Sequence, residues 1–183
     1  LSFGDDPLRM LRAARFSAQL GFTVEEDTER AITELRETLR IVSPERVQSE
    51  LVRLMQTDDP VRGIRVLVET GLIEEFLPEV SALKLEVDEH HHHKDVYEHS
   101  LTVLSQAIAL EQARNPGAGP DVPLRIAALL HDIGKPRTRR FEAGGGVSFH
   151  HHDVVGAKLA RKRLTALRYP TDVVKAVGEL IAL

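Results

Sequence analysis

Apolar side chains recur every three or four residues along most of this chain, a spacing that predicts amphipathic helices. The first stripe starts at Leu8, after Asp5-Asp6-Pro7, and Gly21 is expected to end that helix. Thr23 has capping-box spacing for a second helix that extends to about Leu39. No strand of ordinary length is evident, so the predicted fold class is all-α.

The other predicted helices begin or end at proline, glycine or short polar residues. The first of them starts at Ser43-Pro44, the next runs from Asp59-Pro60 to Gly71, and a short one covers about Ile73–Leu77 and is stopped by Pro78. Two more cover Val96–Arg114 and Pro123–His131, and the last two start near Val154 and Thr171. Residues 81–94 are predicted to form a connector. Gly144-Gly145-Gly146 indicates a loop and possible small hairpin near residues 140–150.

The composition is that of an ordinary globular protein, with 183 residues, 42% of them hydrophobic and 28% charged. The chain has no cysteine, which excludes disulfides and thiolate metal sites and suits a reducing, cytoplasmic location. No apolar run approaches the roughly 20 residues of a membrane span, so no membrane partner is expected. Because Leu1 is not a methionine and Leu183 closes an uninterrupted helical pattern, we expect a piece of a longer polypeptide.

Charge is distributed unevenly along the sequence. Residues 1–89 hold 11 Lys and Arg against 19 Asp and Glu, a net charge of −8, whereas residues 90–183 hold 13 against 9, a net charge of +4. Arginine accounts for ten of the eleven cations in the first part, and arginine binds phosphates and base edges with two hydrogen bonds. The plainer interpretation is a source organism whose proteins favour arginine.

All nine histidines lie between His90 and His152, and their arrangement indicates a metal site. His131 and Asp132 are adjacent, and together they offer an imidazole nitrogen and a carboxylate to one divalent cation. His99, 32 residues upstream, is the expected third ligand. This mixed ligand set suits Mn, Ni, Zn, Co or Mg. The alternative interpretation of His131-Asp132 is a capped helix end without a metal.

Two further residues are candidates for catalysis at this site. A bound metal lowers the pKa of water and neutralises a phosphoryl oxygen. Lys135, one turn beyond Asp132, is expected to hold a phosphate, and His152 is expected to bind a second metal or act as an acid, unless it is only a surface residue. The run His90–His93 is expected to belong mostly to the connector.

The motif His99…His131-Asp132-Ile133-Gly134-Lys135 resembles that of the HD superfamily of metal-dependent phosphohydrolases. The resemblance implies a helical HD domain over residues 95–183 that cleaves phosphate esters. His92, three residues before Asp95, best matches a supporting family histidine. The superfamily pattern ends with a later aspartate, which we expect beyond Leu183, so the HD domain is predicted to be truncated at its C-terminus.

A second constellation lies at the start of the chain. Asp6, Arg9 and Arg12 recur at intervals of three, which predicts one helix face. A carboxylate and a guanidinium together imitate the hydrogen-bonding edge of a base, and Arg12 and Arg15 could hold phosphate. The alternative is an ordinary stripe of surface ion pairs.

Asp5-Asp6-Pro7-Leu8-Arg9, continued to Phe16, resembles the neck of class II tRNA nucleotidyltransferases and of the related poly(A) polymerases. The resemblance implies that residues 1–80 form a helical domain in which Asp6 and Arg9 select CTP or ATP. The run Ser43-Pro44-Glu45-Arg46…Glu50-Leu51 resembles the next neck motif, in which Glu45 and Arg46 would brace the selecting helix.

By this resemblance the chain is a fragment of an enzyme that adds CMP and AMP to tRNA 3′ ends with Mg. No paired carboxylates on a strand are evident, so this stretch is not expected to add nucleotides alone. The resemblance is compatible with an enzyme that adds CCA, one that adds part of CCA, or one that adds poly(A). The sequence does not indicate an oligomeric state. Two alternatives are a free-standing HD phosphohydrolase with a structural N-terminal half and a non-catalytic RNA-binding module.

Overall fold

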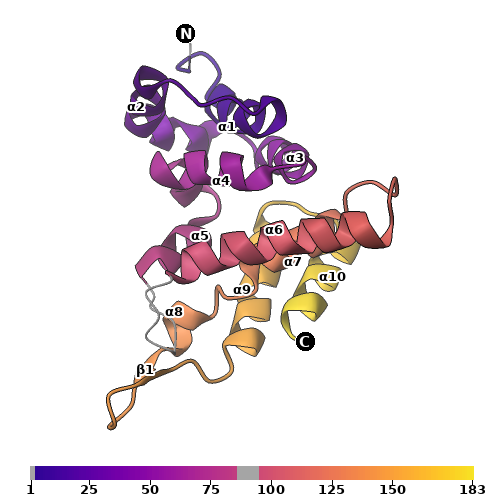
Figure 1. Cartoon of the computed structure of the whole chain (residues 1–183). Coiled ribbons are helices and arrows are strands. Elements are labelled where there is room, and N and C mark those ends of the chain that lie inside the picture. Colours follow the sequence, from indigo (N-terminus) through magenta and orange to yellow (C-terminus); the bar gives the residue numbers. More distant parts are fainter. Residues whose placement is uncertain (1–2, 86–94) are drawn as a thin grey trace.

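Helices make up most of the computed structural model, which describes residues 3–85 and 95–183 (Figure 1). The all-α prediction is therefore confirmed. Up to residue 85 the elements are α1 (Leu8–Leu20), α2 (Glu26–Leu35), the 3-10 helix η1 (Arg36–Ile41), α3 (Pro44–Met55), α4 (Pro60–Glu69), the 3-10 helix η2 (Leu72–Glu75), α5 (Pro78–Ser81) and the 3-10 helix η3 (Ala82–Leu85).

The second half begins with the longest helix of the described residues. Its elements are α6 (Val96–Arg114), α7 (Val122–Leu130), α8 (Lys135–Thr138), β1 (Arg140–Phe141), β2 (Val147–Ser148), α9 (His152–Ala166) and α10 (Thr171–Ile181). The two strands pair antiparallel, with Arg140 opposite Ser148 and Phe141 opposite Val147, which confirms the expected hairpin. Within the described residues no helix combines the length and the apolar character that crossing a membrane requires.

The N-terminal helices pack around α1, which contacts both α3 and α4. Gly63 of α4 permits this close approach, because a Cβ atom there would lie 2.9 Å from the Ala14 carbonyl oxygen and 2.9 Å from Leu54 Cδ1. Gly21 and Gly71 adopt left-handed conformations, with φ of 73° and 75°, and end α1 and α4 as the sequence predicts.

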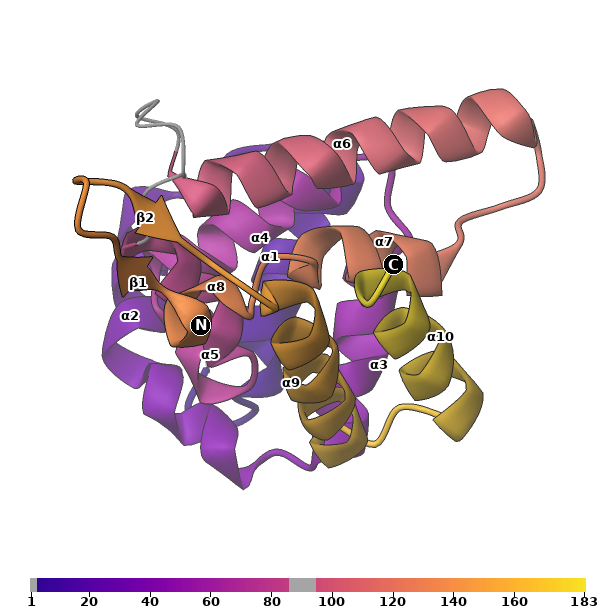
Figure 2. The same ribbon diagram turned by 90° about the horizontal axis from the view of Figure 1, so that it is seen from below.

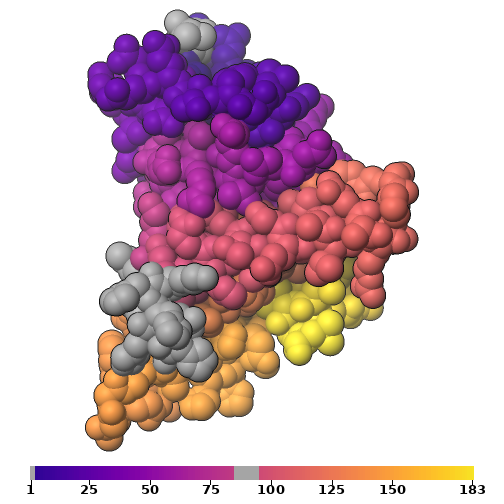
Figure 3. Space-filling model, in the orientation of Figure 1, coloured from indigo at the N-terminus to yellow at the C-terminus, as the bar shows by residue number. Residues whose placement is uncertain are grey.

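In the second half α6 lies along α7, and α10 packs against both α7 and α9 (Figure 2). The space-filling view shows the N-terminal helices at one end of the molecule, α6 across its middle, and α9 and α10 at the other end (Figure 3). One continuous cluster of buried apolar side chains includes residues from both halves. The arrangement therefore places the elements of the two sequence motifs on a shared core.

A buried arginine joins the two halves. Arg125 of α7 is 2% exposed, and its guanidinium donates hydrogen bonds to the carbonyl oxygens of Met55 (2.9 Å) and Thr57 (2.7 Å) at the end of α3. The same guanidinium pairs with Glu111 of α6 at 2.5 Å. These bonds satisfy carbonyl groups that the end of a helix leaves without partners.

Two predicted helix boundaries are wrong. Thr23 does not cap α2: the helix begins at Glu26, Glu25 occupies the N-cap position, and no side chain bonds to the cap. Pro78 does not stop a helix but begins α5, because proline lacks only an N–H that the first turn leaves unused.

The predicted helix to Leu39 and the predicted connector also differ from the structure. After Leu35 the second helix tightens into η1, which buries Leu39. The first residues of the predicted connector are helical, and Leu83 of η3 is fully buried. The rest of the connector, residues 86–94, lies outside the described residues.

Candidate functional site

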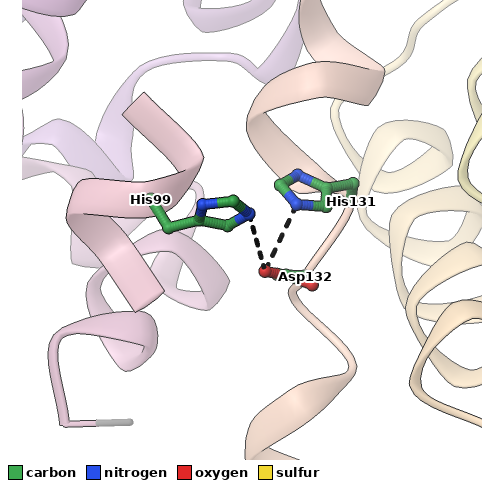
Figure 4. A group of neighbouring side chains, drawn as sticks. All are labelled: His99, His131 and Asp132. Atoms are coloured by element: carbon green, nitrogen blue, oxygen red, sulfur yellow. Dashed lines mark ion pairs between the residues drawn. The ribbon is translucent and has the colours of Figure 1, made fainter. Parts of the chain in front are cut away.

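The end of α7 and the first turns of α6 bring three predicted metal ligands together. His131 follows directly after α7, and His99 projects from α6 toward it (Figure 4). Asp132 Oδ2 lies 3.2 Å from His131 Nε2 and 4.0 Å from His99 Nε2. One ligand atom from each residue falls within 4.8 Å of the others, as a shared cation requires.

The state of Asp132 fits a metal ligand. The residue is 2% exposed, and its Oδ2 atom is buried without a well-aligned hydrogen-bond donor among the described residues. His131 Nδ1 lies 2.8 Å from the Ala128 carbonyl oxygen, which can only accept, so Nδ1 carries the proton and Nε2 can present its lone pair to the centre. A buried carboxylate oxygen that lies close to two imidazole nitrogens forms a suitable binding site for a cation.

The pKa shifts describe the same electrostatic site. Burial opposes ionisation of Asp132, but the hydrogen bond and charge of His131, together with Lys135, lower its pKa to about 2. Burial disfavours the charged imidazole of His131, yet the neighbouring Asp132 raises its pKa above the usual value. A proton on His131 and a metal cation therefore compete for one position.

Lys135 and His152 also face Asp132. Lys135 Nζ lies 3.1 Å from Oδ2 and 5.5 Å from the centre of the Phe149 ring, and its side chain is nearly buried. The structure thus directs Lys135 to the aspartate, where the sequence led us to expect an open phosphate-binding position. His152 Nε2 lies 3.6 Å from Oδ1, and its Nδ1 is 2.9 Å from the Phe149 carbonyl oxygen.

The start of α9 lies against the turn that follows the His-Asp pair. A Cβ atom at Gly134 would meet the His152 carbonyl oxygen at 2.0 Å, so only glycine fits there. A cavity of about 620 Å³ opens beside His131 and the run His150–His152. The centre is therefore accessible from one side. His92, the predicted supporting histidine, lies outside the described residues.

In the first half of the chain, Glu50 of α3 holds two arginines of α1. Arg12 Nε donates to Oε1 at 2.9 Å and Arg15 Nε donates to Oε2 at 2.6 Å, while Glu50 is 3% exposed. Each carboxylate oxygen thus accepts a charge-assisted hydrogen bond, which fixes the direction of both arginine side chains.

The predicted bracing residue Glu45 forms its ion pair outside α1. Its side chain is 65% exposed and pairs with Arg168 at 3.9 Å. Glu50 is the glutamate that holds the arginines of α1, and the sequence carries a signal for its position. Glu50 falls three residues after Val47 and four before Leu54, so it lies on the buried stripe of α3.

Asp6 precedes α1 and does not continue its face. Its Oδ1 accepts a hydrogen bond from the Leu8 backbone N–H at 3.2 Å, as a residue before a helix can. Its Oδ2 lies 3.8 Å from Arg12 Nη1 and 3.6 Å from Arg46 Nη2. The predicted bracing residue Arg46 therefore contacts Asp6 itself.

A cavity of about 500 Å³ adjoins this cluster. Arg9, Arg12 and Arg15 line it together with Phe16, and the Arg15 guanidinium lies 4.5 Å from the centre of the Phe16 ring. The three predicted nucleotide-binding arginines thus share one cavity, while Asp6 is not among its lining residues.

Comparisons with known families divide the chain at the same place as its motifs. Residues 21–84 match the family described as "Probable RNA and SrmB- binding site of polymerase A", and residues 96–182 match the HD domain.

Similar proteins carry related names. The A-adding tRNA nucleotidyltransferase of Deinococcus radiodurans is 42% identical over 182 residues, and the CC-adding tRNA nucleotidyltransferase of Thermus thermophilus is 37% identical over 187 residues. Each alignment covers 96% of this chain, which spans 41% of the length of these curated relatives.

A solved structure described as "The complex structure of CCA-adding enzyme with CTP" matches 99% of this chain and 36% of its own, with a TM-score of 0.56 and 20% identity. At that identity the match concerns the fold. Together, the two family matches in this order and the relatives aligned along nearly its whole length show that the chain is homologous to part of the tRNA nucleotidyltransferases, with the segment matched by the polymerase A model followed by an HD domain.

Proposed function

We propose that this chain is the neck and HD part of a cytoplasmic tRNA nucleotidyltransferase, which adds CMP and AMP from CTP and ATP to tRNA 3′ ends with Mg. Residues 1–80 would contact the nucleotide and tRNA, and residues 95–183 would hydrolyse phosphate esters with a divalent metal. The A-adding and CC-adding relatives support the first role, and the match to the HD domain supports the second.

One observation carries the hydrolytic role: His99, His131 and the buried Asp132 place one ligand atom each within 4.8 Å of one another. These three residues would hold Mn, Ni, Zn, Co or Mg. The metal would supply a nucleophilic water and neutralise a phosphoryl oxygen.

The remaining residues would prepare the site for a phosphate ester. Asp132 is ionised at neutral pH because its pKa is about 2. Lys135 adds a positive charge 3.1 Å from that carboxylate and so favours an anionic substrate at the same point. His152 Nδ1 donates to the Phe149 carbonyl oxygen, so Nε2 would give a proton to the departing oxygen from the imidazolium form of the ring.

In the neck, Asp6 and Arg9 would select the base, while Arg12 and Arg15 would contact phosphate. The hydrogen bonds from Arg12 and Arg15 to Glu50 support this assignment, because they fix two long side chains before a ligand arrives. Arg46 would restrain Asp6 through its ion pair.

The test uses the full-length protein, wild type against His131→Ala/Asp132→Ala. Hydrolysis of bis-p-nitrophenyl phosphate and of a 2′,3′-cyclic nucleotide is measured with each of the five metals, and nucleotide addition is measured on tRNA lacking its CCA end. We expect the double variant to lose hydrolysis by at least about 100-fold and to retain nucleotide addition. Wild-type protein without hydrolysis in any metal would contradict the hydrolytic role.

A second double variant tests whether the neck selects the nucleotide. Asp6→Ala/Arg9→Ala is expected to lose discrimination between CTP and ATP while hydrolysis continues. Unchanged discrimination would favour a free-standing phosphohydrolase with a structural first half.

A further inference from the structure

The surface formed by α8, the hairpin and α9 differs from the rest of the molecule in its charge. Between residues 135 and 166 the sequence holds eight Lys and Arg against two Asp and Glu. The chain as a whole has a net charge of −4. Positive charge is therefore concentrated at the end of the molecule opposite α1 and α2 (Figure 1).

Within the described part of the chain, several of these cations have no acidic partner. Most described arginines form ion pairs, among them Arg30, Arg40 and Arg65. By contrast, among residues 3–85 and 95–183 no carboxylate forms an ion pair with any of four cations on α8 and α9, which are Arg137, Lys158, Arg161 and Lys162. Lys158 and Lys162 are four residues apart on α9, where like charges repel each other and weaken the helix. An external anion would relieve this repulsion.

The cations share a surface that can hold an anion. Arg137 of α8 and Lys162 of α9 line one cavity of about 140 Å³ together with Arg163 and Glu79, which pair with each other at 2.8 Å and so leave the other two cations in excess. Lys158 lies one turn before Lys162 on the exposed face of α9. The cations thus continue beyond the cavity along the helix.

The adjoining hairpin adds an aromatic side chain. Phe141 of β1 is 78% exposed, and the Arg139 guanidinium lies 5.3 Å from the centre of its ring. An exposed aromatic ring beside a positively charged groove is the combination with which proteins bind single-stranded nucleic acid, because bases stack on the ring while the groove follows the phosphates.

Both helices start at the candidate metal centre. Lys135, the first residue of α8, lies 3.1 Å from Asp132, and His152, the first residue of α9, lies 3.6 Å from it. A strand bound along these helices would have one end at the centre. We propose that Arg137, Lys158 and Lys162, with Phe141, form a binding surface for the phosphate backbone of a single-stranded RNA segment. The choice of RNA as partner rests on the proposed function.

The experiment measures binding of a fluorescein-labelled 12-nucleotide RNA by anisotropy at 50 to 300 mM salt. Lys158→Glu/Lys162→Glu is expected to weaken binding at least tenfold at 100 mM salt. The slope of log affinity against log salt should fall by about 1.4, since each single-strand phosphate contact contributes roughly 0.7. Phe141→Ala is expected to weaken binding about tenfold without changing the slope. Lys175→Glu, a charge reversal on the neighbouring α10, is the control and should bind as wild type does.

Two results would contradict the proposed RNA-binding surface. One is no RNA binding by the wild type at 50 mM salt, and the other is equal binding by the wild type and by Lys158→Glu/Lys162→Glu. Binding to phosphatidylserine vesicles that exceeds binding to RNA would assign the surface to a membrane instead. Hydrolysis of bis-p-nitrophenyl phosphate is measured in the same variants and should not change. If hydrolysis is absent from the wild type as well while RNA binding depends on Lys158 and Lys162, the hydrolytic role fails and the surface stands.

Discussion

The neck and the HD domain each bury one carboxylate among basic side chains, and the two carboxylates differ in what surrounds them. Both oxygens of Glu50 accept hydrogen bonds from arginine Nε–H groups, at 2.9 and 2.6 Å. Asp132 Oδ2 instead faces the Nε2 atoms of His99 and His131, with the Lys135 ammonium 3.1 Å away as its one permanent cation among the described residues. The two residues are almost equally buried, at 3% and 2% exposure.

The two carboxylates differ in the groups beside them: arginines donate protons to Glu50, whereas the neutral histidines beside Asp132 can offer lone pairs to a metal. Arginine is always protonated, so Glu50 is satisfied within the protein and serves to fix its partners. Neutral imidazole can offer a lone pair, so Asp132 and its histidines together favour a cation. Burial and charge alone would not separate a structural carboxylate from a metal ligand.

The largest effect on metal binding is expected from Asp132→Asn, which keeps the size of the side chain and removes its charge. At a metal concentration 100 times the dissociation constant, the wild type should gain about 2.7 kcal/mol of unfolding free energy. The variant should gain nothing with Mn or Zn. Thermal unfolding with and without metal measures this. Asp153→Asn, a nearby carboxylate on α9, is the control. If Mn or Zn still raised the unfolding temperature of Asp132→Asn, Asp132 would not be a metal ligand and would not differ from Glu50 in this respect.

A third carboxylate, that of the partly buried Glu111, extends the comparison to pH. Burial would raise its pKa, but the hydrogen bond from Arg125 outweighs burial and lowers the pKa below 4.5. Its folded-state pKa is therefore lower than in the unfolded chain, so its contribution is complete above pH 4.5 and is lost as pH falls through the folded pKa.

Glu111→Gln should accordingly cost about 3 kcal/mol at pH 7, because Arg125 is left buried without its counter-charge. The difference from wild type should shrink below pH 4.5. Urea unfolding at pH 7, 5, 4 and 3 provides the measurement. If the difference in unfolding free energy between wild type and Glu111→Gln stayed the same from pH 7 to pH 3, the Arg125–Glu111 pair would not depend on ionisation of Glu111.

Glu50→Gln should cost about 2 kcal/mol of unfolding free energy, somewhat less than Glu111→Gln, because Arg12 and Arg15 retain access to solvent. It should leave metal binding unaffected. In the full-length protein it should also weaken nucleotide binding, because Arg12 and Arg15, which would contact phosphate, lose their fixed positions. Glu45→Gln is the matched control and should change neither property. Equal effects of the two variants would restore Glu45 as the brace.

The smallest effect is expected for an exposed pair of good geometry. Arg65 bonds to both oxygens of Glu98, at 2.7 and 2.8 Å, but both side chains are more than two fifths exposed. Arg65→Ala should therefore cost about 0.5 kcal/mol in urea unfolding. Arg62→Ala, whose partner Asp59 is 3.8 Å away, should cost still less. A loss above about 2 kcal/mol for Arg65→Ala would show that short distance matters more than burial.

Much of this fold could be predicted from local signals. The bounds of α6 match the prediction, and Gly21 and Gly71 end their helices. Proximity of His99, His131 and Asp132 was also expected, because the relevant signal is a short motif at a helix end. Their roles as ligands, and those of Asp6, Arg9, Arg12 and Arg15 in the neck, stay predictions.

The features that escaped prediction depend on tertiary contacts. Nothing local distinguishes Arg125 from other arginines, because its partners are the carbonyl oxygens of Met55 and Thr57, about 70 residues away. The orientation of Lys135 toward Asp132 likewise follows from the turn between α7 and α8. Glu50 is the exception, because its position on an apolar stripe of the sequence already indicates a buried carboxylate.

The bonds of Arg125 also bear on how such an enzyme can be rearranged over evolution. Two families meet in this chain, and their boundary invites the idea that either part is exchangeable. Yet an HD domain transplanted to a foreign neck would bring a buried guanidinium to a helix end of different shape, and a neck stripped of its HD domain would lose the donors for two carbonyl oxygens. We therefore expect the two segments to be exchanged as one piece, and a chimaera to fold well only where the receiving α3 ends in the same place.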